Sequence, residues 1–237
     1  MRRIAIHGTG RMAFAIADAA SGRSDVEIVA LLGPKQPDWE TTIPWVPCLS
    51  EFAGQPDFLI DFTLPEGTQA AANWCREQGV PLVSGVTGLP ETVVEALKVA
   101  AQTVPVLWSP NLSLGVNLLA DLAGRAGAVL ENEVAVAIED IHHQWKKDAP
   151  SGTALMLGHR VAQERGGDSS AIEYDSIREG EVIGVHTVHF TMDGEEFELV
   201  HRAHDRSIYA LGAINSGKWL LSQAPGFYSA RDWLAGI

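Results

Sequence analysis

The chain has 237 residues, of which 46% are hydrophobic, and this excludes wholesale disorder and leaves room for one large folded domain or two smaller ones. Its formal net charge of −13 argues against nucleic acid and anionic membranes as partners, because both are bound through clusters of Lys and Arg. Two widely spaced cysteines exclude a disulfide scaffold, and no apolar run reaches the roughly 20 residues of a membrane helix, so we expect a cytoplasmic protein.

The N-terminal residues predict a strand, a glycine-rich turn and a helix, in that order. The strand covers residues 2–7 and the helix residues 12–20. Between them, Gly8, Gly10 and Ala13 satisfy the spacing G-x-G-x-x-G/A, in which small residues let the backbone approach a pyrophosphate at a helix N-terminus. A tight turn without any ligand can show the same spacing, so the motif needs support from the rest of the chain.

The second predicted strand, residues 26–32, bears on the choice of nucleotide. In strictly NAD-using domains this strand usually ends with Asp or Glu, which holds the ribose 2′-hydroxyl. This chain has Gly33, Pro34 and Lys35 instead. Because no carboxylate would repel a 2′-phosphate there, we expect NADPH to be at least tolerated, and the cofactor to be NADPH, NADH or both.

Strands and helices continue to alternate as far as residue 111. After an irregular loop over residues 36–47, strands are predicted at residues 58–63, 81–84 and 104–108, with helices at 65–78 and 91–102. This alternation is typical of a Rossmann-type, doubly wound parallel α/β sheet, whose ligands lie beyond the carboxyl ends of the strands. We therefore expect the turns at Gly8, Thr63, Gly85 and Asn111 to gather along one edge.

The pattern changes after residue 111. A helix is predicted over residues 114–127, and residues 133–141 alternate like a strand with two unlike faces. A second helix, residues 154–162, precedes strands at 172–177, 182–191 and 196–202, of which the last two are joined by a hairpin turn at Asp193-Gly194. These elements predict a second, α+β domain built on a mixed sheet.

Residues 207–223 return to a helical pattern, and a short segment at 228–234 closes the chain. We expect this segment to pack back on the first domain. The predicted division is a dinucleotide-binding domain of residues 1–111 plus 207–237, and a second domain of residues 112–206.

The segment from Glu139 to Thr153 concentrates polar chemistry in an otherwise acidic chain. His142, His143, Lys146 and Lys147 fall within six residues, and a Ser-Gly-Thr turn then leads into the second helix. A helix N-terminus offers unpaired N–H groups and the positive end of the helix dipole to an anion. The segment therefore predicts proton donors beside an anion site, although a polar strand end followed by a helix cap would explain the same residues without function.

Four other histidines suggest a metal site only at first sight. His186 is followed by His189, and His201 by His204. Side chains three residues apart on a strand point to opposite faces, and no Cys or carboxylate cluster stands beside these histidines in the sequence. We therefore expect no metal.

With these segments in place, the sequence resembles the dihydrodipicolinate reductase family, the 4-hydroxy-tetrahydrodipicolinate reductases of bacterial lysine and diaminopimelate biosynthesis. The longest shared motif is His142-His143-x-x-Lys146-x-Asp148-Ala149-Pro150-Ser151-Gly152-Thr153-Ala154. Shorter ones are Ile60-Asp61-Phe62-Thr63, Gly85-Val86-Thr87-Gly88, Asn111-x-Ser113-x-Gly115-Val116-Asn117 and Gly10-Arg11-Met12. The resemblance extends from residue 4 to about residue 234, nearly the whole chain.

The resemblance implies a role for each part of these motifs. His142 is expected to be the general acid/base residue and Lys146 the proton donor. The residues expected to contact substrate are His143, Ser151, Gly152 and Thr153. Those expected to hold the nucleotide, with Lys35 beside them, are Gly8, Thr9, Gly10, Arg11, Met12, Gly85, Val86, Thr87, Ser109, Pro110, Asn111 and Leu112. The family is also expected to form homotetramers, which would make the second domain responsible for both substrate binding and oligomerisation.

Three features depart from the family pattern. The glycine turn is one residue shorter than the usual form, Ala13 replaces a glycine, and the acidic residue after the second strand is absent. These departures concern nucleotide affinity and cofactor preference and leave the proton-donating residues in place.

Two other functions stay open from the sequence. One is a related two-domain enzyme that acts on another amino or imino acid, such as aspartate dehydrogenase. The other is a nucleotide sensor that has kept the fold and lost the chemistry. A sensor should retain the glycine turn without the proton donors, and this chain retains both.

Overall fold

A computed structural model of the chain describes residues 1–130 and 133–237 and divides into two compact units. Unit 1 comprises Met1–Leu112 and Ser207–Ile237, and unit 2 comprises Ser113–Arg206. Leu112, which the sequence assigned to the second domain, belongs to unit 1, where its side chain is only 1% exposed. Within the described residues, no helix has the length and apolar character needed to cross a membrane.

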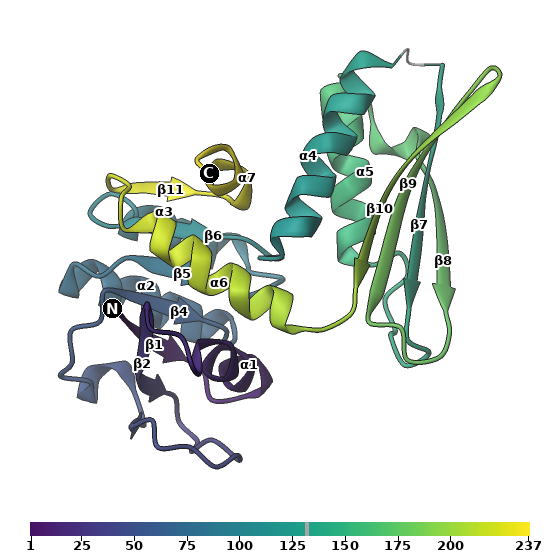
Figure 1. Ribbon diagram of the computed structural model, residues 1–237. Helices are drawn as coiled ribbons and strands as arrows, with labels where there is room; N and C mark the ends of the chain where they lie inside the picture. The colour runs from purple at the N-terminus through teal and green to yellow at the C-terminus, as the bar shows by residue number, and fades with distance from the viewer. Residues whose placement is uncertain (131–132) are drawn as a thin grey trace. The chain divides into compact units, whose positions relative to one another are not determined.

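Unit 1 is built on a single parallel sheet with the strand order β11-β6-β5-β4-β1-β2-β3 (Figure 1). The strands are β1 (Arg2–His7), β2 (Val26–Leu32), β3 (Trp45–Val46), β4 (Phe58–Asp61), β5 (Leu82–Ser84), β6 (Pro105–Trp108) and β11 (Gly226–Tyr228). The helices are α1 (Arg11–Ala20), α2 (Pro65–Gln78), α3 (Glu91–Ala100), α6 (Ser207–Leu220) and α7 (Ala230–Ala235), with a short 3-10 turn at Leu49–Glu51. This confirms the predicted doubly wound sheet. The predicted loop over residues 36–47 was wrong in one detail, because β3 lies within it and pairs with β2.

Both faces of this sheet are buried, as the nearly continuous apolar strands require. On one face, Ile4, Ile6 and Phe58 pack with residues of α1, α6 and α7. On the other face, Leu59 and Leu82 pack with residues of α2 and α3. The C-terminal helices thus complete the core of unit 1. An ion pair also links α6 to the start of β2, because Lys218 Nζ lies 2.6 Å from Asp25 Oδ2.

Unit 2 is a mixed sheet with two helices on one of its faces (Figure 1). Its strands are β7 (Ala135–His142), β8 (Glu173–Arg178), β9 (Gly184–Met192) and β10 (Glu195–Ala203), in the order β10-β9-β7-β8. Its helices are α4 (Leu114–Val129) and α5 (Gly152–Glu164), with a 3-10 turn at Ser169–Ala171. β7 and β8 are parallel and the other pairs are antiparallel, which confirms the predicted α+β second domain.

Candidate active site

Four neighbouring strands of unit 1 end side by side. The register pairs His7 with Asp61, Asp61 with Ser84, and Ser84 with Trp108, and these residues end or nearly end their strands. Backbone hydrogen bonds carry the alignment one residue further, from Phe62 N to His7 O at 3.0 Å and from Gly85 N to Asp61 O at 3.0 Å. The turns after β1, β4, β5 and β6 therefore gather along one edge of the sheet, as predicted.

The glycine turn after β1 has the geometry that the motif requires. Gly8 has φ +120°, a conformation that side-chain-bearing residues rarely adopt, and a Cβ there would lie 3.1 Å from Phe62 O. A Cβ at Gly10 would meet nothing within 4 Å, so the fold itself does not require glycine at that position. Since α1 begins at Arg11, this open space lies directly before a helix N-terminus. The turn thus fits a nucleotide pyrophosphate.

The other predicted nucleotide contacts differ in how accessible they are. Thr87 and Pro110 are exposed, whereas the side chains of Val86 and Leu112 are buried at 6% and 1% exposure. Any contact from Val86 or Leu112 must therefore come mainly from the backbone. Lys35 is exposed on the segment that follows β2. The same segment passes beside the glycine turn, because a Cβ built on Gly33 would lie 3.4 Å from Thr9 Cγ2.

Beneath this edge lies the buried carboxylate of Asp61, a residue of the motif Ile60-Asp61-Phe62-Thr63 to which the sequence assigned no role. Asp61 is fully buried and accepts hydrogen bonds from the hydroxyls of Thr63 at 2.6 Å, Thr68 at 2.7 Å and Ser84 at 2.9 Å. His7 Nδ1 lies 3.2 Å from Asp61 Oδ1. Because these groups come from β1, β5, α2 and the turn after β4, Asp61 holds together the turns that would contact a nucleotide.

In unit 2, the alternation of β7 places two polar residues on the same face as the core. Val136 and Ile138 are buried against α4 and α5, and Asp140 and His142 follow on the same side at 0% and 8% exposure. His143 lies just past the strand end and is only half-buried. A strand period of two, applied to the predicted strand, would have revealed that Asp140 and His142 share a face.

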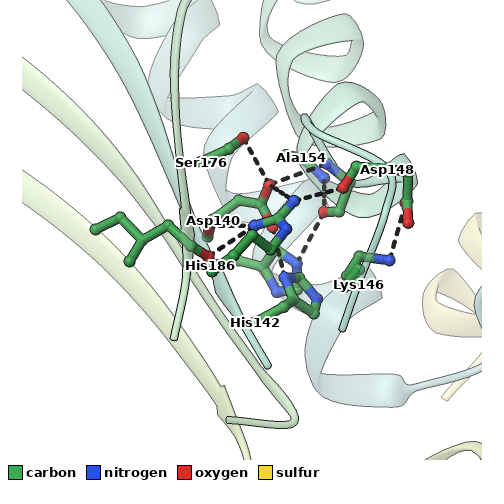
Figure 2. A network of polar contacts seen from close by, with 10 residues as sticks. Asp140, His142, Lys146, Asp148, Ala154, Ser176 and His186 are labelled. Atoms are coloured by element: carbon green, nitrogen blue, oxygen red, sulfur yellow. Dashed lines mark hydrogen bonds and ion pairs between the residues drawn. The ribbon is translucent and has the colours of Figure 1, made fainter. Parts of the chain in front are cut away.

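Asp140 is the centre of this polar network (Figure 2). Its Oδ2 accepts hydrogen bonds from the Ser151 backbone N–H at 2.9 Å, from Ser176 Oγ at 3.0 Å and from the Arg178 guanidinium at 3.1 Å. Its Oδ1 lies 2.6 Å from His142 Nδ1. Asp140 therefore connects β7 to β8, to the start of α5 and to the predicted acid/base residue.

Arg178, which the sequence did not single out either, holds the segment that carries Lys146. Its guanidinium donates to the backbone carbonyl of Asp148 at 2.6 Å and to that of Asp140 at 3.1 Å. Lys146 Nζ in turn lies 2.8 Å from Asp148 Oδ2, an ion pair visible in Figure 2. This ammonium lowers the pKa of Asp148. A substrate carboxylate would compete with Asp148 for the same ammonium.

The predicted anion site at Ser151, Gly152 and Thr153 needs a correction. Ser151 is only 2% exposed, its backbone N–H is bound to Asp140, and its hydroxyl accepts from Ala154 N at 3.2 Å as the cap of α5. The helix N-terminus therefore already carries a carboxylate of the protein. Gly152 is exposed and Thr153 is half-buried, so these two residues, rather than Ser151, are placed to meet an external anion.

A row of imidazoles crosses the inner face of the unit 2 sheet. The ring centroids of His142 and His186 are 5.1 Å apart, and those of His186 and His201 are 6.5 Å apart. His201 pairs with His186 across β10 and β9, and Asp140 pairs with His186 across β7 and β9. The histidines were compared along the sequence, as pairs three residues apart, and so their grouping across strands was missed.

The prediction that no carboxylate cluster accompanies these histidines is wrong, because Asp140, His142 and His186 offer ligand atoms within 4.8 Å of one another. Their geometry nevertheless fits a hydrogen-bonded network better than an ion site. Asp140 Oδ2 already accepts three donors, and the 2.6 Å between Asp140 Oδ1 and His142 Nδ1 is short for two ligands of one ion. With metal–ligand bonds of about 2.0–2.2 Å in a tetrahedron, ligand atoms lie roughly 3.3 Å apart.

The environment lowers the pKa values of all three groups, for different reasons. Burial lowers the pKa of His142, an effect that nearby Asp140 partly offsets. Burial, followed by the proximity of His142, lowers the pKa of His186 to about 4. Burial alone would raise the pKa of Asp140, but the Ser151 N–H, Arg178 and Ser176 outweigh it and bring that pKa to about 2. Near neutral pH, the site thus holds neutral imidazoles beside an ionised carboxylate.

These shifts predict two stages of acid destabilisation. The pKa of His186 is about 4 in the folded chain, below its value of about 6.5 in the unfolded chain. The neutral His186 side chain therefore contributes to the free energy of unfolding above pH 6.5, and this contribution is lost as the pH falls toward 4. The pKa of Asp140 is about 2 in the folded chain and about 3.9 in the unfolded chain. Its contribution to the free energy of unfolding is therefore lost as the pH falls from about 3.9 to about 2. Urea unfolding at a series of pH values should show both stages, each with a slope of up to about 1.4 kcal/mol per pH unit.

His186→Gln should reduce the upper stage, to which the lowered pKa values of His142 and His201 also contribute, and Asp140→Asn should reduce the lower stage, to which Asp148 also contributes. A wild-type free energy of unfolding that stays constant from pH 6.5 to 4 would contradict the buried, neutral state of His186.

Comparisons with known proteins cover both units. A family model described as the N-terminus of dihydrodipicolinate reductase matches residues 2–112, and a model described as its C-terminus matches residues 115–234. The 4-hydroxy-tetrahydrodipicolinate reductase of Stenotrophomonas maltophilia strain R551-3 is 43% identical and covers 98% of this chain and 97% of its own length. The 4-hydroxy-tetrahydrodipicolinate reductase of Xanthomonas euvesicatoria pv. vesicatoria strain 85-10 is 40% identical, and the match covers 97% of this chain and 96% of that protein.

Solved structures show the same fold. Dipicolinate-bound dihydrodipicolinate reductase from Paenisporosarcina sp. TG-14 superposes with a TM-score of 0.83 at 22% identity and covers 97% of each chain. Aspartate dehydrogenase from Thermotoga maritima gives a TM-score of 0.52 at 10% identity, over 94% of this chain and 97% of its own. At these identities, each of the two matches shows a shared fold alone.

Proposed function

The chain belongs to the dihydrodipicolinate reductase family, and from this membership we propose that it is a 4-hydroxy-tetrahydrodipicolinate reductase. It transfers a hydride from NAD(P)H to the cyclic imine dicarboxylate of lysine and diaminopimelate biosynthesis. The observation that carries the proposal is the buried contact of His142 with Asp140, 2.6 Å long, on the same segment as Lys146 and directly before the N-terminus of α5. A non-catalytic sensor would not need this polar cluster.

The residues of unit 2 handle protons and anions in this reaction. Lys146 is the proton donor for the atom that gains negative charge, and His142 acts as general acid/base beside it. The substrate carboxylates bind Lys146, His143 and the exposed turn at Gly152 and Thr153, while Ser151 supports this turn from within. Charge-assisted hydrogen bonds of this kind contribute about 1.5 to 3 kcal/mol each.

The residues of unit 1 hold the nucleotide, which supplies the hydride when bound. The turn from Gly8 to Met12 would hold its pyrophosphate, since a Cβ at Gly10 would meet no protein atom within 4 Å. The turns at Gly85 to Thr87 and Ser109 to Asn111 lie along the same edge, and their exposed residues Thr87 and Pro110, with the backbone beside them, provide further contacts.

Lys35 is proposed to favour the 2′-phosphate of NADPH. Lys35→Glu should raise the KM for NADPH by about tenfold or more and change that for NADH much less, because a carboxylate repels the phosphate and accepts from the ribose hydroxyl. The measurement is steady-state kinetics with both cofactors, with Lys98→Glu on the exposed end of α3 as a matched charge control. An unchanged ratio of the two KM values would remove Lys35 from the nucleotide site.

The function itself is tested with the purified chain and freshly generated 4-hydroxy-tetrahydrodipicolinate, by following the nicotinamide absorbance with NADH and with NADPH. We expect oxidation of at least one cofactor and inhibition by pyridine-2,6-dicarboxylate. A parallel reaction with oxaloacetate and ammonia tests the aspartate dehydrogenase alternative. Turnover there, without turnover of the cyclic diacid, would replace the proposed substrate.

Exposed apolar side chains of unit 2 bear on how copies of the chain assemble. Apolar side chains of unit 2 are exposed on α4 and β10, including Leu122 at 42%, Val129 at 83% and Phe197 at 42%. Leu122, Val129 and Phe197 help to line a groove of about 420 Å³. Exposed apolar surface of this kind supports association between copies, and we propose a cytoplasmic homotetramer. Light scattering after size exclusion would measure its mass.

A further inference from the structure

We propose that Asp140 and Gly184 together decide which nitrogen of His142 exchanges protons with the substrate. Asp140 holds Nδ1, and Gly184 keeps Nε2 uncovered. Both are positioning residues that act through His142. This inference rests on the proposed reductase function, in which His142 is the acid/base residue.

The Asp140 carboxylate fixes the ring from one side. Asp140 is fully buried, and its Oδ2 already accepts from Ser151, Ser176 and Arg178, so Oδ1 is the oxygen left to face the ring. Oδ1 lies 2.6 Å from His142 Nδ1. The contact is short but is not aligned as a hydrogen bond, because neither Asp140 Oδ1 nor His142 Nδ1 meets hydrogen-bond geometry. Two lone pairs would repel each other at this distance, so the proximity of the ionised carboxylate favours the tautomer with the proton on Nδ1 and the lone pair on Nε2.

Gly184, the first residue of β9, lies beside the other nitrogen. A Cβ built on Gly184 would lie 3.2 Å from His142 Nε2 and 3.6 Å from its Cδ2. No side chain therefore covers Nε2 from this direction. The φ of Gly184 is not in the left-handed region, so alanine fits the backbone and would place a methyl group against the reacting nitrogen.

The two residues give separable effects on His142. Asp140→Asn can turn its amide NH₂ toward Nδ1, which then becomes an acceptor, and the proton moves to Nε2. Gly184→Ala leaves the Asp140 contact intact and obstructs Nε2. A positioned general acid/base group typically contributes about 10²- to 10⁴-fold, so a partial loss of its orientation or access should lower activity by about 10- to 100-fold.

The test uses ¹⁵N-histidine NMR and steady-state kinetics on the full chain. The His142 resonances are assigned by their loss in His142→Gln, and their shifts report which ring nitrogen is protonated. Glu139→Gln is the control, because Glu139 lies on the opposite face of β7.

We expect the wild type, Glu139→Gln and Gly184→Ala to hold the proton on Nδ1, and Asp140→Asn to move it to Nε2. Asp140→Asn and Gly184→Ala should each lower kcat by about 10- to 100-fold, part of the contribution of a positioned acid/base group, with nucleotide Kd unchanged, and Asp140→Glu should recover part of the loss. A wild-type proton on Nε2, or full kcat in Gly184→Ala, would overturn the proposal.

The wild-type spectrum decides the tautomer even if Asp140→Asn fails to fold. Because the spectrum needs no turnover, it also separates this inference from the reductase assignment: a chain with Nδ1 protonated but no reductase activity would refute the function alone.

Discussion

Lys146→Ala and His142→Gln should each lower turnover by about 10² to 10⁴ while leaving nucleotide affinity nearly unchanged. Lys146 is the ammonium that pairs with Asp148, and His142 lies against Asp140 on the inner face of β7. Removing either one takes away a proton donor or acceptor without touching unit 1. Steady-state kinetics for the cyclic diacid and a fluorescence titration with NADPH measure the two effects separately.

Lys147→Ala provides the matched control for this first prediction. Lys147 is an exposed ammonium adjacent to Lys146 in the sequence, and it has no assigned role. Its removal changes the net charge by the same amount and should preserve turnover. Full turnover in Lys146→Ala or in His142→Gln would show that the role given to that residue is wrong.

Gly10→Val should weaken the binding of NADPH by about 100-fold, or roughly 2.7 kcal/mol, without a comparable loss of stability. Gly10 has φ −90°, which valine can adopt, and its Cβ would meet no protein atom within 4 Å. The added side chain would instead occupy the approach of the pyrophosphate to the helix N-terminus. Calorimetric titration and a thermal unfolding curve give the two quantities.

Gly167→Val is the corresponding control, because a Cβ at Gly167 also meets nothing within 4 Å and the residue lies in unit 2. It should bind NADPH like the wild type. If Gly10→Val also bound NADPH normally, the glycine turn would not be the pyrophosphate site, and the shorter form of this turn would have to be explained in another way.

The fold could be predicted from the sequence because its determinants are local. Strand β1, the glycine turn and α1 follow one another within twenty residues, and the alternation at Val136 and Ile138 marks β7 and its buried face. The small strand β3 was missed because Trp45-Val46 has no periodicity of its own. Its pairing with β2 supplies the order that the local sequence lacks.

The polar network of the candidate site depends on contacts between distant parts of the chain. Arg178 lies 38 residues from Asp140, and Ser176 lies 36 residues away. Neither has a local pattern that marks it as a partner. Ser151 is a further example. Its N–H was predicted to bind a ligand, because nothing in the local sequence shows that the Asp140 carboxylate already accepts a hydrogen bond from it.

The most direct test of the reductase assignment follows the hydride itself. The purified chain is given NADPH or NADH that carries deuterium at the transferable position of C4, together with freshly generated 4-hydroxy-tetrahydrodipicolinate, and the diacid product is analysed by mass spectrometry. We predict that the product gains one deuterium as the cofactor is oxidised, and that Lys146→Ala slows this gain. A diacid recovered without deuterium from either cofactor, under conditions where the folded chain binds NADPH, would contradict the account.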